Sequence, residues 1–190
     1  GNTGWSYDDV LPFFKKMENY QGNTSELRGE EGPLKVSEVN DRNPIYDAIF
    51  KSGEVNNIPF NKDYNGKDQE GLGYTQTTIY KGERMSAEVA YLRPIKSRKN
   101  LTIITNSLVT KLLFEKKKCI GVEVKNKNKL STFMTSKEVI LSGGAINSPQ
   151  ILELSGIGNS SILKKNGIEP IHHLVGVGEN LRDHIAPRII

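Results

Sequence analysis

The stretch SGGAINSPQILELSGIG, residues 142–158, decides the fold of this chain. An apolar segment runs into Gly143 and Gly144, and glycines allow the backbone to approach a neighbouring group closely because they lack a Cβ atom. Ser148 precedes a proline, a pair that begins helices, and Gly156 is a residue type that ends them. We therefore expect a helix between Ser148 and Gly156, with free amide groups at its start.

A strand, two glycines and a helix start form a turn that suits an anion or a cofactor. Tight packing of the helix on the strand would require the same two glycines. From this turn alone, the two interpretations are equally good.

Upstream of the turn, residues 101–141 have the period of β-strands. Apolar residues alternate at Leu101–Thr105 and at Ile120–Val124, and a third apolar segment, Glu138–Leu141, leads into the glycines. The basic run Lys116–Lys118 lies between alternating stretches, so we interpret it as a solvated hairpin turn rather than a nucleic-acid patch. The pattern predicts a small antiparallel meander followed by a buried strand.

The N-terminal region contains two candidate helix starts. Ser6 and Asp9 have the spacing of a capping box. Pro12 would break the helical hydrogen-bond ladder, so we expect a short turn and a helix that restarts near Pro12. Asn43 followed by a proline predicts a second helix that runs through about Val55.

Two segments of the first hundred residues lack any hydrophobic period. Gly22–Pro33 is rich in Gly, Asn, Ser and Glu, and we expect an exposed loop. Asn61–Gly73 should be a long loop, and long ordered loops are often functional. The composition changes near Asn100, which is the candidate domain boundary.

The composition indicates a soluble globular chain. Its 26 basic and 22 acidic residues give a net charge of +4, and the basic residues are scattered apart from one short run. We expect no nucleic-acid partner, because aromatic residues do not interleave with a basic stripe. No apolar run approaches the roughly 18 residues that cross a bilayer. Cys119, the single cysteine, excludes an internal disulfide and fits a reducing compartment, so we expect a structural thiol.

Residues 142–158 closely resemble the second signature of the glucose-methanol-choline (GMC) oxidoreductases. Four further segments resemble this family in the same order along the chain, namely Gly4–Pro12, Asn61–Gly73, Gly82–Leu92 and Gly176–His184. The similarity covers nearly the whole chain, and chance does not produce such collinearity.

The resemblance implies a mixed α/β fold. It implies part of an FAD-binding Rossmann-like domain with a β-meander, joined to part of a substrate-binding domain. On this basis residues 1–100 should form substrate-side helices and loops. Residues 101–190 should form the meander and the return to the FAD-binding domain.

The resemblance also implies FAD as the cofactor and assigns five residues to its surroundings. Val109 matches a valine whose backbone contacts the adenine, and a peptide group can read the edge of a heterocycle. Gly144 and Ala145 would lie on the turn nearest the cofactor. Asn180 and His184 belong to a loop that approaches the substrate side.

The reaction implied for the parent enzyme is oxidation of an alcohol CH–OH group to an aldehyde or ketone by hydride transfer to flavin. A histidine would remove the hydroxyl proton. We expect that histidine, and the glycine-rich dinucleotide fingerprint, in segments that this central fragment lacks, so the fragment alone should be inactive.

One departure from the family concerns the substrate. Choline-oxidising members carry a glutamate two residues after the Asp183–His184 pair, and Ala186 stands there in this chain. A carboxylate would face a quaternary ammonium group, so its loss favours an uncharged primary alcohol over choline.

Other hypotheses stay open at this point. The chain could be a binding or scaffold domain that reuses the fold without chemistry, or part of an enzyme with lyase activity or a redox partner in place of oxygen. Nothing in the segment separates an oxidase from a dehydrogenase, so the electron acceptor is unknown. We expect no metal, because His172 and His173 lack ligand spacing with any acid or thiol. We expect a cytoplasmic protein, with membrane association of the parent as an open alternative.

Overall fold

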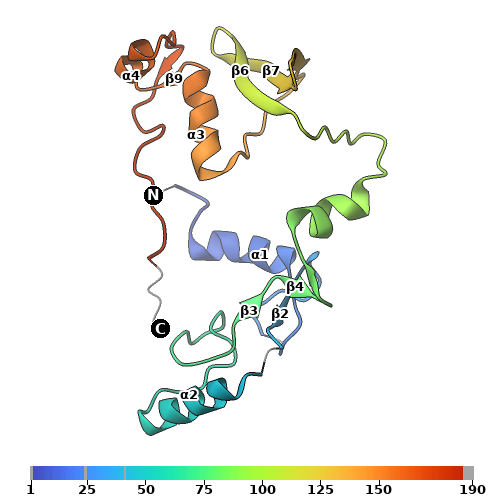
Figure 1. Cartoon of the computed structure of the whole chain (residues 1–190), viewed down its shortest axis with the longest axis vertical. Helices are drawn as coiled ribbons and strands as arrows, with labels where there is room; N and C mark the ends of the chain where they lie inside the picture. The colour runs from blue at the N-terminus through green and yellow to red at the C-terminus, as the bar shows by residue number, and fades with distance from the viewer. Residues whose placement is uncertain (1, 24, 41, 186–190) are drawn as a thin grey trace. The chain divides into compact units, whose positions relative to one another are not determined.

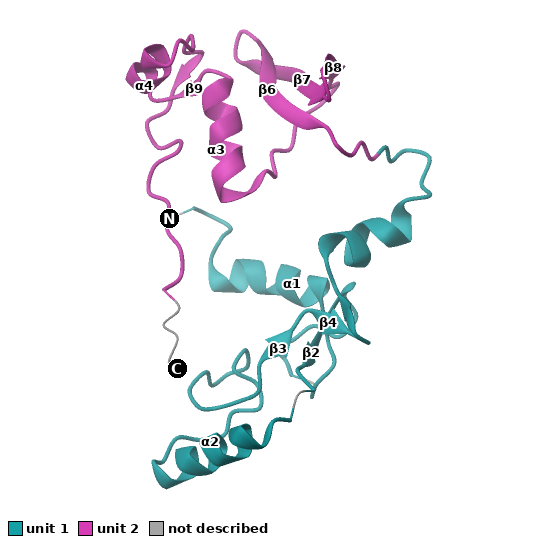
Figure 2. Cartoon of the chain, in the orientation of Figure 1, with its two compact units in different colours: residues 1–102 teal, residues 103–190 magenta. Residues whose placement is uncertain are grey.

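The computed structural model describes residues 2–23, 25–40 and 42–185. The chain divides into two compact units, Gly1–Thr102 and Ile103–Ile190 (Figures 1 and 2). We refer to them as the first and second units.

The first unit combines helices with short strands. Its elements are α1 (Tyr7–Met17), β1 (Glu18–Tyr20), β2 (Leu34–Glu38), α2 (Pro44–Val55), β3 (Gln76–Thr77), β4 (Ile79–Tyr80), β5 (Glu83–Arg84), a π-helical segment (Glu88–Leu92) and a 3-10 turn (Arg93–Ile95). Strand β2 lies between β1, to which it is parallel, and β3, to which it is antiparallel, while β4 and β5 form a separate antiparallel pair.

Helix α1 begins with the predicted capping box. The Ser6 hydroxyl accepts a hydrogen bond from the Asp9 amide at 3.4 Å, and the Asp9 carboxylate accepts one from the Ser6 amide at 3.1 Å. The predicted break at Pro12 is wrong, because α1 continues through this residue. Pro12 has no N–H group to donate to the carbonyl of Asp8, four residues earlier. Asp8 is exposed, so water can bond to this carbonyl instead.

The Gly22–Pro33 segment is irregular, as expected, but the prediction that it is exposed is wrong at Arg28, which is only 4% exposed. Its Nε and Nη2 atoms donate to the two carboxylate oxygens of Glu18 at 3.0 and 2.6 Å. Its Nη1 atom donates to Asp63 at 2.5 Å and to the Gln76 side-chain oxygen at 2.9 Å. These four residues and Tyr20 form what we call the Arg28 cluster.

The Arg28 cluster is stabilised electrostatically in spite of its burial. The guanidinium lies 3.7 Å from the ring centroid of Tyr20. Burial lowers the pKa of Arg28, but the hydrogen bond to Glu18 and the charges of Glu18 and Asp63 outweigh it, and the net pKa is raised. Burial also raises the pKa of the Tyr20 phenol, and the charge of Asp63 raises it further. The cluster therefore holds a charged arginine where β1, β3 and two loops meet.

Helix α2 begins at Pro44, and the Asn43 side chain accepts a hydrogen bond from the Ile45 amide at 3.0 Å, which confirms the predicted cap. Phe50 of this helix packs edge-to-face against Phe60 and Tyr74, with ring centroids 4.9 Å apart in both pairs. The aromatic contacts attach α2 to the loop region that follows it.

The second unit contains an antiparallel meander, as expected, but of the predicted strand segments only Ile120–Val124 lies in one of its strands. Its elements are β6 (Leu108–Glu115), β7 (Lys118–Asn126), β8 (Lys129–Met134), α3 (Gly144–Leu154), β9 (Ile157–Gly158), α4 (Ser160–Lys165) and β10 (His172–His173). Strands β6, β7 and β8 are antiparallel neighbours in that order, and Lys116 and Lys117 lie in the turn between the first two.

Two predicted strands are absent from the described residues. Leu101–Thr105 and Glu138–Leu141 are irregular, and Ile140 is 79% exposed, so the expectation of a buried strand before the glycines is wrong. A strand needs hydrogen-bonding neighbours, and no described segment pairs with either stretch.

Helix α3 begins at Gly144, four residues before the predicted start at Ser148. The Ser148 hydroxyl acts from inside the helix, where it accepts a hydrogen bond from the Gly143 amide at 2.9 Å. The helix ends before Gly156, whose φ of +86° is costly for other residues. None of the helices in the described ranges is long and apolar enough to span a membrane.

Replacing the central arginine should destabilise the first unit strongly. Arg28→Met keeps most of the volume but leaves the carboxylates of Glu18 and Asp63 without their buried counter-charge. We expect the free energy of unfolding to fall by about 3–5 kcal/mol, measured by urea denaturation. Arg98→Met, at an exposed arginine, is the matched control and should leave the transition unchanged. Equal effects of the two substitutions would contradict a structural role for the cluster.

The capping box predicts an acid-sensitive helix start. Hydrogen bonds from the Ser6 hydroxyl and then from the Ser6 amide lower the pKa of Asp9 from its ordinary value of 3.8. The box therefore stabilises α1 at pH values above 3.8, and this contribution is lost as the pH falls through the lowered pKa. An NMR titration of Asp9 should show a midpoint below 3.8 that moves upward in Ser6→Ala. An unchanged midpoint in that variant would refute the capping role.

Candidate functional site

Val109 lies on an edge strand of the meander, opposite Val124 of β7. The Leu112 amide, further along β6, points away from β7 and donates to the Ser155 hydroxyl at 2.8 Å. Leu112 pairs with Val122, and Val109 pairs with Val124. Val122 and Val124 are two residues apart on β7, so their peptide groups point in the same direction. The N–H and C=O groups of Val109 therefore point away from β7, as those of Leu112 do. The Val109 backbone thus lies at the free edge of the sheet, which suits the backbone contact to adenine that the sequence predicts.

Gly144 and Ala145 form the start of α3, where the first amides of a helix have no intrahelical partner. Both residues are exposed, and Gly144 has a φ of +83° with open space where a Cβ atom would stand. Unpaired amides and the positive end of the helix dipole favour an anionic group. The geometry fits the predicted contact with a phosphate-containing cofactor through the backbone.

Ser155, which sequence reasoning missed, connects these two places. Its hydroxyl accepts from the Leu112 amide and donates to the Ile151 carbonyl at 2.5 Å, so the C-terminal end of α3 is attached to β6. The residue is 6% exposed. No hydrogen bond in the described ranges joins Val109 directly to Gly144, and their relation depends on this attachment. A serine just after a helix gives no sequence signal for such a contact.

Asn180 and His184 lie in the segment after β10. Asn180 adopts a φ of +58°, and the His184 amide donates to the carboxylate of its neighbour Asp183 at 2.8 Å. Both predicted residues are exposed, and among the described residues no hydrogen bond links either of them to α3. The same segment approaches α3 at Gly178, whose Cβ position would lie 3.2 Å from a Glu153 carboxylate oxygen. The roles assigned to Asn180 and His184 remain predictions.

The other two histidines have structural contacts. The Nδ1 atom of His173 lies 3.1 Å from the Ser160 amide and 2.9 Å from its hydroxyl, at the start of α4. His172 borders a cavity of about 240 Å³ together with Phe114 and Ile157. Both histidines form β10. Within the part of the chain that the structure describes, no group of three or more His, Cys, Asp or Glu side chains could hold a metal.

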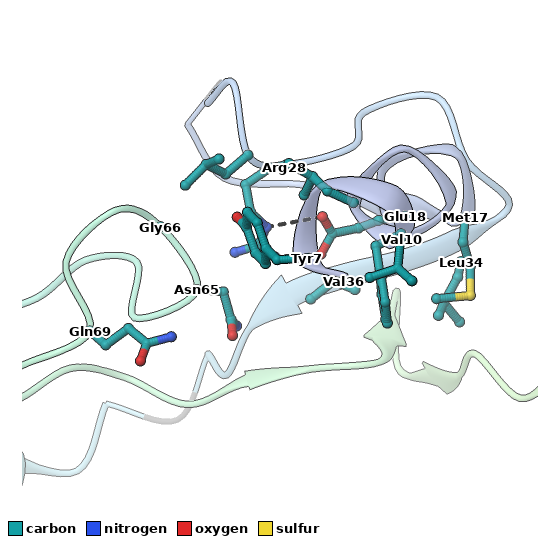
Figure 3. A pocket seen from close by; sticks show the side chains of 13 residues that line it. Tyr7, Val10, Met17, Glu18, Arg28, Leu34, Val36, Asn65, Gly66 and Gln69 are labelled. Carbon is teal, nitrogen blue, oxygen red and sulfur yellow. Dashed lines mark hydrogen bonds and ion pairs between the residues drawn. The ribbon is translucent and has the colours of Figure 1, made fainter. Parts of the chain in front are cut away.

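The first unit contains a cavity of about 390 Å³, shown in Figure 3. Apolar side chains of α1 and β2, among them Val10 and Val36, form much of its wall. Asn65 and Gln69 from the Asn61–Gly73 loop contribute neutral amides. An apolar wall with a few neutral polar groups suits an uncharged molecule that carries a hydroxyl group.

The Arg28 cluster positions the polar side of this cavity. Arg28 and Glu18 border the cavity themselves, and the dashed line in Figure 3 marks their interaction. Asp63, the carboxylate that Arg28 also binds, accepts a hydrogen bond from the Asn65 amide at 3.2 Å. The conformation of the loop at Asn65 therefore depends on the charge of Arg28, which lies 35 residues before Asp63 in the sequence.

Comparison with known proteins places these features in one family. A profile described as GMC oxidoreductase matches residues 1–186. The chain is 45% identical over 185 residues to choline dehydrogenase, mitochondrial, from Homo sapiens, covering 97% of this chain and 31% of that protein. It is 44% identical over 187 residues to an oxygen-dependent choline dehydrogenase from Staphylococcus aureus, covering 97% and 33%. The chain thus spans about a third of the length of these curated relatives.

Solved structures agree with the sequence relatives. An FAD-dependent oxidoreductase from Chaetomium thermophilum is similar with a TM-score of 0.88 and 32% identity, covering 96% of this chain and 34% of that one. Pyridoxine 4-oxidase from Mesorbium loti is similar with a TM-score of 0.80 and 28% identity, covering 91% and 34%. The predicted mixed α/β fold with part of a Rossmann-like FAD domain is confirmed.

Removing the Ser155 hydroxyl should loosen the connection between α3 and β6. Ser155→Ala leaves the buried Leu112 amide unpaired, and we expect the free energy of unfolding to fall by about 1–3 kcal/mol. If the edge at Val109 contributes to cofactor binding, the intact protein should also bind FAD about tenfold more weakly, which corresponds to about 1.4 kcal/mol. Ser161→Ala, at an exposed serine of α4, is the control for calorimetry and flavin titration. If Ser155→Ala lowers the stability but leaves the FAD affinity unchanged, the attachment of α3 to β6 does not contribute to cofactor binding.

Proposed function

The chain belongs to the GMC oxidoreductase family, whose relatives include FAD-dependent enzymes, and from that premise we propose that the protein containing it oxidises the CH–OH group of a small alcohol to an aldehyde or ketone. The observation that carries the proposal is the match of residues 1–186 to the family in one continuous alignment. When bound, FAD supplies the acceptor for the hydride that leaves the alcohol carbon.

The described residues contribute binding and orientation to this reaction. The Val109 backbone at the sheet edge and the free amides of Gly144 and Ala145 are the groups that we propose to hold FAD. They offer peptide donors and acceptors without a side chain that must change charge. We assign no proton-transfer role to His172 or His173.

The first unit is proposed to provide part of the substrate side. Its cavity has an apolar wall and the neutral amides of Asn65 and Gln69, and these groups would bind an alcohol with an apolar body without favouring a charge. Arg28 and Glu18 also border the cavity, and Arg28 forms ion pairs with both Glu18 and Asp63. The neutral amides of Asn65 and Gln69 are the groups that support an uncharged substrate.

Two observations bear on the substrate, and they favour different molecules. The two curated relatives are named choline dehydrogenases, which favours choline. Ala186, which lies outside the described residues, stands where a carboxylate is expected for recognition of a quaternary ammonium group. We propose an uncharged primary alcohol, because a cationic substrate without a charge partner pays for its desolvation. We also propose a cytoplasmic location, which the single free cysteine supports.

Activity of the intact protein tests the proposed reaction. We expect alcohol-dependent reduction of bound FAD, followed as bleaching of the flavin absorbance under anaerobic conditions. A protein that binds FAD stoichiometrically but is reduced neither by primary alcohols nor by choline would support the scaffold hypothesis instead. Anaerobic reduction is the suitable measurement because it does not depend on the electron acceptor.

The substitution Ala186→Glu tests the substrate preference. The wild-type protein should reduce its flavin with a higher kcat/KM for primary alcohols than for choline. The new carboxylate should raise kcat/KM for choline by about tenfold or more, since a charge-assisted contact contributes roughly 1.5–3 kcal/mol. Ala186→Gln has the same size without the charge and should leave choline turnover low. A wild-type preference for choline would show that the substrate assignment is wrong.

A further inference from the structure

The Gln76 side chain uses its full hydrogen-bonding capacity. A glutamine amide offers two lone pairs on its oxygen and two N–H groups on its nitrogen. The Gln76 Oε1 atom accepts from Arg28 Nη1 at 2.9 Å and from Asn65 Nδ2 at 3.2 Å. The Nε2 atom donates to the Tyr20 hydroxyl at 3.0 Å and to the Asp63 carboxylate at 2.9 Å. Gln76 is therefore the residue that joins the Arg28 cluster to Asn65.

Arg28 and Asp63 together dictate the orientation of the Gln76 amide. A guanidinium has donors and no acceptor, so the Gln76 atom that faces Nη1 must be the oxygen. An ionised carboxylate only accepts, so the atom that faces Asp63 must be the nitrogen. Turning the amide over would place N–H groups against the guanidinium and an oxygen against the carboxylate. Only one orientation satisfies both partners.

The orientation of Gln76 in turn dictates that of Asn65. Because the Gln76 oxygen is an acceptor, the Asn65 atom that faces it must be the amino nitrogen. The Asn65 Oδ1 atom is the other end of this amide, and in the described part of the chain no group donates a hydrogen bond to it. The Asn65 backbone amide also donates to Asp63 at 3.2 Å. Backbone and side chain of Asn65 are thus both held by the same network.

The fixed Asn65 amide borders the cavity of about 390 Å³ (Figure 3). Gln69 lines the same cavity, but its side chain forms no hydrogen bond with the described residues and can turn either end of its amide toward a ligand. A group that is held in advance loses less conformational entropy when a ligand binds. The network therefore provides the cavity with an oxygen acceptor whose orientation is set before binding.

The reacting hydroxyl of an alcohol cannot be the partner of this acceptor throughout the reaction. Oxidation of a CH–OH group sends the hydride to the flavin and the single hydroxyl hydrogen, as a proton, to a base. A neutral carboxamide oxygen is an acceptor of hydrogen bonds and has no titration near neutral pH, so Asn65 does not take that proton. The oxygen of Asn65 requires a different donor on the same ligand.

We propose that the substrate is an alcohol with a second hydroxyl group, and that Asn65 Oδ1 accepts a hydrogen bond from this second group. Asn65 is then a specificity-determining residue, and Gln76 is the positioning residue that holds it. The inference rests on the proposed function, because it takes the cavity as the place where the alcohol binds. Apolar wall residues such as Val10 and Val36 suit the carbon chain between the two hydroxyl groups.

Anaerobic stopped-flow reduction of the intact, FAD-loaded protein tests the role of Asn65. The probes are butanediol with a hydroxyl group at each end and its monomethyl ether, which keeps one reacting hydroxyl and lacks the second donor. The wild-type protein should bind the diol about fivefold more tightly than the ether, as expected for one hydrogen bond. Asn65→Leu should raise the Kd of the diol about fivefold, with little change in the limiting rate of flavin reduction or in the Kd of the ether.

A double-mutant cycle tests the positioning role of Gln76. Gln76→Leu leaves the Asn65 amide free to turn, so it should abolish the preference for the diol to the same extent as Asn65→Leu. The double variant should lose no more than either single variant, because both substitutions remove the same contact. Losses that add would show that Gln76 acts on binding by another route and would refute its role. Flavin content reports folding, and Asn65→Leu, at an exposed residue, keeps the test decisive if Gln76→Leu does not fold.

Asn100→Leu is the matched control, because it removes an exposed asparagine of the same unit and should leave the preference for the diol unchanged. A wild-type protein that is reduced by both probes without preferring the diol would overturn this inference and leave the proposed reaction standing. A preference that survives Asn65→Leu, or that Asn100→Leu also removes, would overturn it as well. Reduction by neither probe nor by any other primary alcohol would instead contradict the proposed function, and the inference with it.

Discussion

A buried guanidinium between two carboxylates organises the first unit. Arg28 is only 4% exposed. Its guanidinium forms ion pairs with Glu18 and Asp63 and lies over the ring of Tyr20. A buried ion pair contributes little net stability compared with an apolar core, but a buried charge without its partner is costly. The Arg28 cluster therefore favours one arrangement of the segments that carry its residues. The short strands of this unit form few backbone hydrogen bonds. The side-chain interactions of the Arg28 cluster hold the loops in place instead.

The second unit uses backbone geometry in place of charge. The Val109 peptide lies at an unpaired sheet edge, and the first amides of α3 are unpaired because a helix start always leaves donors without partners. Ser155 relates these two features by holding α3 to β6. A cofactor with an aromatic base and phosphate groups can bind to such peptide groups without requiring particular side chains.

Under the proposed function, the two units have separate tasks. Neutral amides and apolar walls in the first unit suit a small uncharged molecule, and peptide groups in the second suit a nucleotide cofactor.

The sequence by itself determined the features that depend on near neighbours. The capping box at Ser6, the cap at Asn43 and the lysine turn of the meander were predictable because the interacting groups lie within a few residues of each other, and the family followed from collinear segments. Tertiary structure decided the rest. The burial of Arg28 requires partners 35 and 48 residues away, and no local pattern distinguishes such an arginine from an exposed one. The predicted strand at Glu138–Leu141 failed for the same reason, since an apolar segment becomes a strand only where another strand lies beside it.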